Sequence, residues 1–191
     1  EQIRILSIED SNYPHLLAQI PAPPTILFWK GNIDLLSSPT ISIVGSRKST
    51  NYGSKVIEGF VLSFVKARLT IVSGLAIGTD SKAHKSAIKH QGTTICVLGS
   101  PINSIHPKSN KTFAEKIISN GSGLLLSEYF PGDPIRPENF PVRNRIISGL
   151  SPATIIIEAA PNSGSLITAR KALEQGREVF AVPGDIFSRF S

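Results

Sequence analysis

Cysteine, methionine and long apolar runs are scarce or absent in this sequence, and each absence excludes a class of protein. A single cysteine, Cys96, allows no intrachain disulfide, which favours a protein of the reducing cytosol over a secreted one. Cys96 lies in the apolar run 94–98, so we expect it to be buried. No stretch reaches the roughly 18 uninterrupted apolar residues of a membrane span, and no signal peptide is visible. We therefore predict a cytoplasmic protein with no membrane partner.

The length and charge of the chain set further limits. Its 191 residues, of which 40% are hydrophobic, are enough for one domain with a sizeable core. Lys and Arg number 20 against 14 Asp and Glu, and the resulting net charge of +6 points weakly to a polyanionic partner. Because the chain begins at Glu1 and has no methionine, we expect a fragment of a longer protein.

Residues 1–39 differ from the rest because prolines interrupt them. One short helical pattern lies around residues 15–19, and one extended apolar piece covers residues 26–29. We interpret this segment as an N-terminal arm that packs on the main domain, with Phe28 and Trp29 as packing anchors rather than stacking platforms.

From Thr40 onward, apolar runs alternate with helical patterns. The apolar runs cover residues 41–44, 70–73, 93–98, 124–127, 153–157 and 178–182, and the helical patterns lie near 53–68, 80–90, 110–120, 141–149 and 166–175. The runs are continuous rather than alternating with polar residues, which is typical of parallel strands covered on both faces. We predict an α/β fold over 40–191: an extended Rossmann-like, doubly wound, mostly parallel sheet with helices on both faces and a truncated C-terminal end.

The loops at the carboxyl ends of the predicted strands are where such a sheet binds ligands. They are rich in Gly, Ser, Thr, Arg and Lys, and they contain no cysteine pair, carboxylate pair or Asp-His-Asp cluster; they lie at 45–50, 74–79, 99–110, 128–143 and 159–165. This composition indicates a surface that holds phosphates. It gives no catalytic residue, no metal ligand and no cofactor.

The stretch 140–170 carries the strongest local signal. Its predicted strand is followed by the turn Ser163-Gly164-Ser165 and then by a helix. That order leaves free backbone N–H groups at a helix start, which favours phosphate. In the alternative, Ser163 or Ser165 merely caps the helix. Arg143 and Arg145, which flank Asn144 one short segment away, favour the anion site.

Two nucleotide motifs are absent from the turn 45–53. It is neither a GxGxxG fingerprint nor a Walker A loop, so no machinery for ATP hydrolysis is visible. Arg47 and Lys48 follow a buried strand directly, which favours a phosphate-positioning pair over two solvated side chains. Asp80 and His84 are one helical turn apart, and we expect a structural pairing, or a helix cap at Asp80, rather than a metal or acid–base pair.

Together these segments resemble the DprA/Smf family, the DNA-processing proteins of bacterial natural transformation. The resemblance is carried by IVGSR at 43–47, SGLA at 73–76, FPVRNRIISGLS at 140–151, SGSLITAR at 163–170 and FAVPG at 180–184. It covers nearly the whole chain in collinear order, and the RNRI and SGSLITAR blocks are its specific part. One departure is His106-Pro107, where the family usually has Tyr-Pro, so stacking by a tyrosine is not expected there.

The resemblance implies a single-stranded DNA-binding protein that protects incoming strands, forms a homodimer and helps to load the RecA recombinase, without being an enzyme. Taken with the basic loops, it implies DNA contacts at Gly45, Ser46, Arg47, Lys48, Gly74, Phe140, Arg143, Asn144, Arg145, Ser163, Gly164, Ser165 and Thr168. For Arg145 an inward pairing with Glu128 or Glu158 is the alternative.

Two other hypotheses stay open. A phosphoribohydrolase of the lysine-decarboxylase-like family carries a PGGxGTxxE segment, which Pro183-Gly184-Asp185 lacks and residues 160–165 match only in part. The other hypothesis is a nucleotide-sensing Rossmann module without catalysis. Binding of oligo-dT, hydrolysis of AMP and binding of a mononucleotide separate the three.

Overall fold

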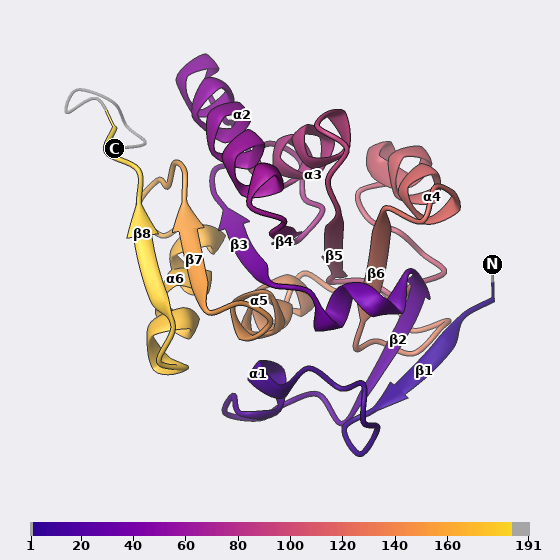
Figure 1. Ribbon diagram of the computed structural model, residues 1–191. Helices are drawn as coiled ribbons and strands as arrows, with labels where there is room; N and C mark the ends of the chain where they lie inside the picture. The colour runs from indigo at the N-terminus through magenta and orange to yellow at the C-terminus, as the bar shows by residue number, and fades with distance from the viewer. Residues whose placement is uncertain (1, 185–191) are drawn as a thin grey trace.

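The continuous apolar runs of the sequence form the parallel part of one sheet, as predicted (Figure 1). The computed structural model describes residues 2–184. Within them the strands are β1 (Arg4–Ser7), β2 (Ile26–Gly31), β3 (Thr40–Val44), β4 (Thr70–Ser73), β5 (Thr94–Leu98), β6 (Gly123–Ser127), β7 (Ala153–Ile156) and β8 (Glu178–Ala181). They lie in the order β1-β2-β6-β5-β4-β3-β7-β8, and all neighbours from β6 to β8 are parallel. The predicted C-terminal end, residues 185–191, falls outside the described residues.

The strand order reverses between β3 and β7, which decides where a ligand can bind. From β3 the chain first adds β4, β5 and β6 on one side, and then returns to place β7 and β8 on the other. The loops after β3 and β7 therefore diverge and leave a crevice at the carboxyl edge of the sheet.

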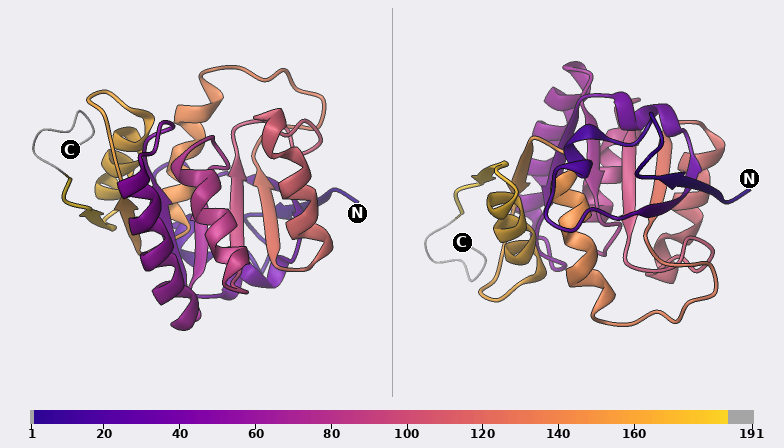
Figure 2. Two further views of the ribbon diagram at one scale, coloured as in Figure 1. Left: turned by 90° about the horizontal axis from the view of Figure 1, so that it is seen from above. Right: turned by 90° about the horizontal axis from the view of Figure 1, so that it is seen from below.

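Helices cover both faces of the sheet (Figure 2), which explains why the central strands β3 to β6 are buried along their length. They are α1 (His15–Ala18), α2 (Asn51–Lys66), α3 (Thr79–Lys89), α4 (Lys111–Ser119), α5 (Asn139–Gly149) and α6 (Gly164–Glu174), with 3-10 turns at Ile33–Ser37 and Lys108–Asn110. Strand residues such as Ile43 and Cys96 pack toward α2, α3 and α4, and their neighbours Val44 and Ile95 pack toward α1 and α5. Within residues 2–184, no helix combines the length and apolar character needed to cross a membrane.

Residues 1–39 extend the sheet with two antiparallel strands. β2 pairs with β6 and β1 pairs with β2, while α1 packs its Leu17 against Gly149 of α5. Phe28 and Trp29 are buried, which confirms them as packing anchors. The antiparallel pairing is set by backbone hydrogen bonds to β6, a partner that is distant in sequence.

Candidate functional site

Two adjoining cavities lie at the carboxyl edge of the sheet, where β3 and β7 diverge. One, of about 290 Å³, extends from the loop after β3 to the start of α6. The other, of about 410 Å³, extends from the same loop to the segment that precedes α5. Arg47, Ala76 and Phe140 line both cavities, so we treat them as one feature, the carboxyl-edge groove.

The start of α6 forms one end of the groove. No side chain caps this helix: the hydroxyl groups of Ser163 and Ser165 lie 2.7 Å apart and bind each other. Asn144 and Thr168 fix the turn by donating to the backbone oxygen of Gly164 at 3.1 and 3.3 Å. The Leu166 amide donates to the backbone oxygen of Ser163 at 3.1 Å, so within residues 2–184 the amides of Gly164 and Ser165 are the ones that α6 leaves to the groove. The capping alternative for Ser163 and Ser165 is not what the structure shows.

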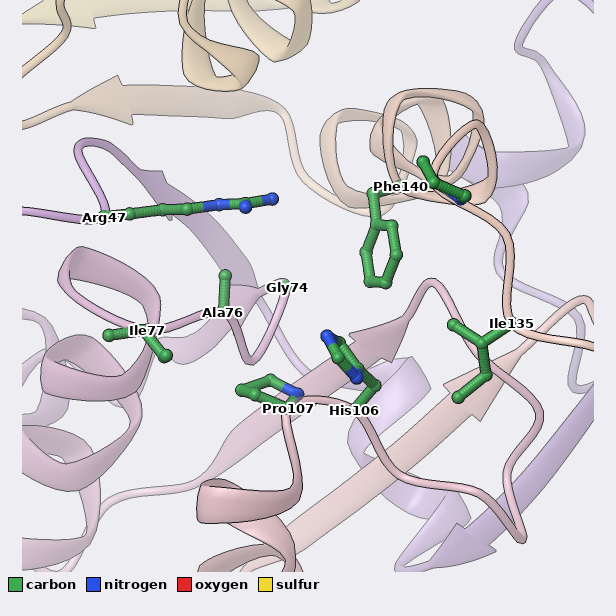
Figure 3. A pocket seen from close by; sticks show the side chains of 9 residues that line it. Arg47, Gly74, Ala76, Ile77, His106, Pro107, Ile135 and Phe140 are labelled. Atoms are coloured by element: carbon green, nitrogen blue, oxygen red, sulfur yellow. The ribbon is translucent and has the colours of Figure 1, made fainter.

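The loop after β3 forms the middle of the groove and carries Arg47. The amide and hydroxyl of Thr79 both donate to the backbone oxygen of Ser46 at 3.1 Å, and Lys82 Nζ donates to that of Ser49 at 3.1 Å. A Cβ at Gly45 would lie 2.7 Å from Thr79 Oγ1, so glycine permits this close approach. Arg47 itself is exposed and forms no ion pair within residues 2–184. Its side chain extends across the groove toward Phe140 (Figure 3).

Apolar side chains form the other end. The rings of Phe140 and His106 lie 5.5 Å apart between centroids, and Ile135, Pro107 and Pro137 complete the wall (Figure 3). Sequence reasoning identified the loops 99–110 and 128–143 that bring these residues here. It singled out His106 only as a departure from the family's Tyr-Pro and did not single out Ile135, because no spacing rule joins residues from loops that are distant in sequence.

Arg143 lines the floor of the groove and is only 4% exposed, so its contact with DNA stays a prediction. Its Nη1 donates to the backbone oxygens of Gly74, at 2.8 Å, and Val97. A Cβ at Gly74 would lie 2.7 Å from Arg143 Nη2 and 2.8 Å from Asp80 Oδ2, so both charged groups close over this glycine. Its main role is therefore to join the ends of β4 and β5.

The buried Asp80 and Arg143 perturb each other's ionisation. Burial raises the pKa of Asp80, and the charge of Arg143 opposes that shift. Burial likewise lowers the pKa of Arg143 to about 10, with Asp80 opposing. Asp80 also accepts a hydrogen bond from the amide of Ala76 at 3.2 Å. The role of Asp80 is thus structural: its carboxylate accepts from the Ala76 amide and lies near the charge of Arg143, and His84 instead has its Nδ1 2.6 Å from Thr94 Oγ1.

Arg145 does not line either cavity of the groove, and its contact with DNA stays a prediction. Its Nη2 pairs with Glu128 Oε1 at 2.5 Å, and its Nε donates to the backbone oxygen of Ala22 at 3.1 Å. The inward pairing with Glu128 is therefore the correct alternative. Lys48 is exposed but does not line either cavity.

The other predicted site residues all line the groove. They are Gly45, Ser46, Arg47, Gly74, Phe140, Asn144, Ser163, Gly164, Ser165 and Thr168. Across the described range 2–184, no group of three or more His, Cys, Asp or Glu side chains is arranged to hold a metal ion.

A mostly parallel, doubly wound sheet with helices on both faces and a groove at its switch point defines a Rossmann-like α/β protein. Comparison with known proteins then specifies the family. Residues 4–191 match the model of the family described as DNA recombination-mediator protein A, and the chain belongs to that family.

Curated relatives agree with this assignment. The chain is 45% identical over 185 residues to the DNA processing protein DprA of Streptococcus pneumoniae and 43% identical over 190 residues to that of Bacillus subtilis. These alignments cover 97% and 99% of this chain but only 64% and 63% of the relatives. The chain therefore spans somewhat less than two thirds of their length.

Solved structures show the same fold. The X-ray structure of DprA from S. pneumoniae superimposes with a TM-score of 0.93 at 43% identity, covering 100% of this chain and 66% of that one. A structure of DNA processing protein A from Helicobacter pylori gives 0.87 at 29% identity, covering 97% and 83%. A molybdenum cofactor binding protein from Rippkaea orientalis, at 18% identity and a TM-score of 0.56, shares the fold alone.

Proposed function

We propose that this domain binds single-stranded DNA in the carboxyl-edge groove. The observation that carries the proposal is the position of Arg47, which extends between the uncapped start of α6 and the ring of Phe140. In a single strand, each phosphate is followed by a base whose faces are open. The groove offers matching partners in the same order, a phosphate site beside an apolar wall.

Each part of the groove has a distinct chemical role. The guanidinium of Arg47 takes a phosphate with two parallel hydrogen bonds, and its flat face stacks on a base. The amides at the start of α6 bind a second phosphate, aided by the helix dipole. The Phe140 ring stacks on a base, a contact that every base can make, so little sequence preference is expected. A duplex hides the faces of its bases and cannot use this wall.

The relatives support the same assignment. The H. pylori structure is described as giving insight into a single-stranded DNA binding mode of that protein, and it aligns with 97% of this chain. By analogy with the family, we infer that this protein protects incoming strands in the cytosol during natural transformation and helps to load RecA.

We further propose that it works as a homodimer without catalysis. A dimer doubles the DNA-contacting surface and raises the effective concentration of a long strand. The groove presents Asp80 as its acidic group, and that carboxylate faces Arg143 rather than a position for attack on DNA. The pairing of β1 with β2, and of β2 with β6, supports treating residues 1–39 as an arm of the same domain rather than a unit of its own.

The test is a fluorescence-anisotropy titration with oligo-dT, repeated with a blunt duplex. We expect tighter binding of the single strand, with log affinity falling as log salt rises, each neutralised phosphate adding roughly 0.7 to the slope. Equal affinity for the duplex or a flat salt response would refute the proposal. AMP hydrolysis and mononucleotide binding on the same preparation test the enzyme and the nucleotide-sensor hypotheses, and turnover of AMP would overturn the non-enzyme assignment.

A further inference from the structure

Glu158 connects the two phosphate-binding elements of the groove. It follows β7, is 6% exposed, and leads into the turn 159–163 that ends at the start of α6. Both of its carboxylate oxygens bind Thr50, at the end of the loop that carries Arg47. Oε2 accepts from the Thr50 amide at 2.9 Å and Oε1 from the Thr50 hydroxyl at 2.5 Å.

Thr50 transmits this contact to helix α2. It is the N-cap of α2, and its hydroxyl oxygen accepts from the amide of Gly53 at 3.1 Å. A Cβ at Gly53 would lie 2.4 Å from Glu158 Oε2 and 2.7 Å from its Cδ, so the carboxylate reaches Thr50 only because residue 53 is glycine. The Glu158 carboxylate thus ties the end of the loop 45–50 to the segment that follows β7.

The same contact distinguishes the two helix starts that face this edge of the sheet. At α2, a helix of 16 residues, an internal carboxylate already satisfies the positive end of the dipole. At α6, no side chain takes that place. The start of α2 is therefore occupied by a carboxylate of the protein, and the start of α6 is left for a phosphate.

We propose that Glu158 is a positioning residue for DNA binding: it fixes the loop 45–50 so that Arg47 extends across the groove, and it reserves the start of α6 for phosphate. Glu158 acts through Thr50 and does not touch DNA. The inference rests on the proposed single-stranded DNA binding and deepens it, because it assigns a role to a negative charge beside a site for a polyanion.

The first experiment compares Glu158→Ala with Glu158→Gln in oligo-dT titrations at a temperature at which both are folded. Glutamine can accept from the Thr50 amide and donate to its hydroxyl, which keeps both bonds without the charge. We expect alanine to weaken binding about tenfold, the scale of one or two lost charge-assisted hydrogen bonds, and glutamine to restore most of it.

Two results would overturn the proposal. If the carboxylate merely repelled DNA, both variants would bind more tightly than the wild type. If Glu158 were only structural, Glu158→Ala would lower the melting temperature and leave the affinity of the folded protein unchanged.

A second experiment displaces the carboxylate from the opposite side. Gly53→Ala puts a methyl carbon 2.4 Å from Glu158 Oε2, too close for the carboxylate to stay, and we expect it to weaken oligo-dT binding about as much as Glu158→Ala. Gly59→Ala is the matched control, since it lies in the same helix with nothing within 4 Å of its Cβ position, and it should bind as the wild type does. In a Glu158→Ala background, Gly53→Ala should cost little further affinity, because the close neighbour that remains is Ser49 Oγ at 3.0 Å, which a small side-chain adjustment relieves.

The design separates this inference from the proposed function. Failure of the wild type to bind oligo-dT would refute the function itself. Normal binding by a folded Gly53→Ala protein would refute the role of Glu158 alone, even if Glu158→Ala did not fold.

Discussion

Arg143 Nη1 lies 2.8 Å from the backbone oxygen of Gly74 and donates a hydrogen bond to it. The same nitrogen donates to the backbone oxygen of Val97, so a side chain from α5 joins the carboxyl ends of β4 and β5. Asp80 of α3 faces the guanidinium across Gly74. The floor of the groove is therefore one buried charge network, which holds four elements in a fixed relation.

We predict that Arg143→Ala acts first on stability. It would leave two buried backbone oxygens without this donor and remove the nearby charge that opposes the rise in the pKa of Asp80, which costs about 2 to 5 kcal/mol of the free energy of unfolding. Urea unfolding measures this loss. A variant that kept wild-type stability and lost only DNA affinity would instead make Arg143 a direct ligand.

Arg47→Ala should act on binding and not on stability. The side chain is exposed and unpaired within residues 2–184, so the melting temperature should stay nearly unchanged. Loss of its charge-assisted bonds should weaken oligo-dT binding by about 1 to 3 kcal/mol. Lys48→Ala is the control, because this substitution removes the same positive charge from the adjacent position, which does not line the groove. If both variants weakened DNA binding equally, Arg47 would contribute only through the net charge of the protein.

Gly164→Ala tests whether a DNA phosphate binds close to the backbone at the start of α6. Nothing lies within 4 Å of a Cβ at this position, and its backbone does not require glycine, so the free protein should be as stable as the wild type or slightly more so. DNA affinity should nevertheless fall, since the methyl group occupies the space in front of the free amides. Paired melts and anisotropy titrations give both quantities. Unchanged affinity would remove the start of α6 from the DNA path.

His84 should make the protein less stable in mild acid. It is fully buried, and burial, with the nearby charge of Arg143, lowers its pKa to about 3. The unfolded chain, with a histidine pKa near 6.5, binds a proton that the folded protein does not, so stability falls as pH drops from about 6.5 toward 3. Between pH 7.5 and 5.5 we expect a loss of about 1 to 1.5 kcal/mol from this group.

Urea unfolding at the two pH values measures the loss. His84→Gln should remove most of the slope, whereas replacement of the exposed His15 should keep it. An identical slope in the wild type and in His84→Gln would mean that another group titrates.

The sequence by itself determined the layers of the fold and the edge at which the site lies. Continuous apolar runs require cover on both faces, and helical patterns between them supply it, so the parallel sheet followed from local patterns. The Gly/Ser turns after 41–44 and 153–157 then marked the carboxyl edge. These features depend on residues that are neighbours in the chain.

Only the tertiary structure decided which charged side chains serve the groove. Arg143 and Arg145 are two residues apart on α5, and because successive helical residues point about 100° apart, they cannot share one direction. Arg143 turns into the core toward Gly74, Arg145 turns to Glu128 and the arm, and Arg47 alone extends into the groove. That division depends on which carbonyl and carboxylate partners the fold brings within reach, and no spacing in the sequence records those distances.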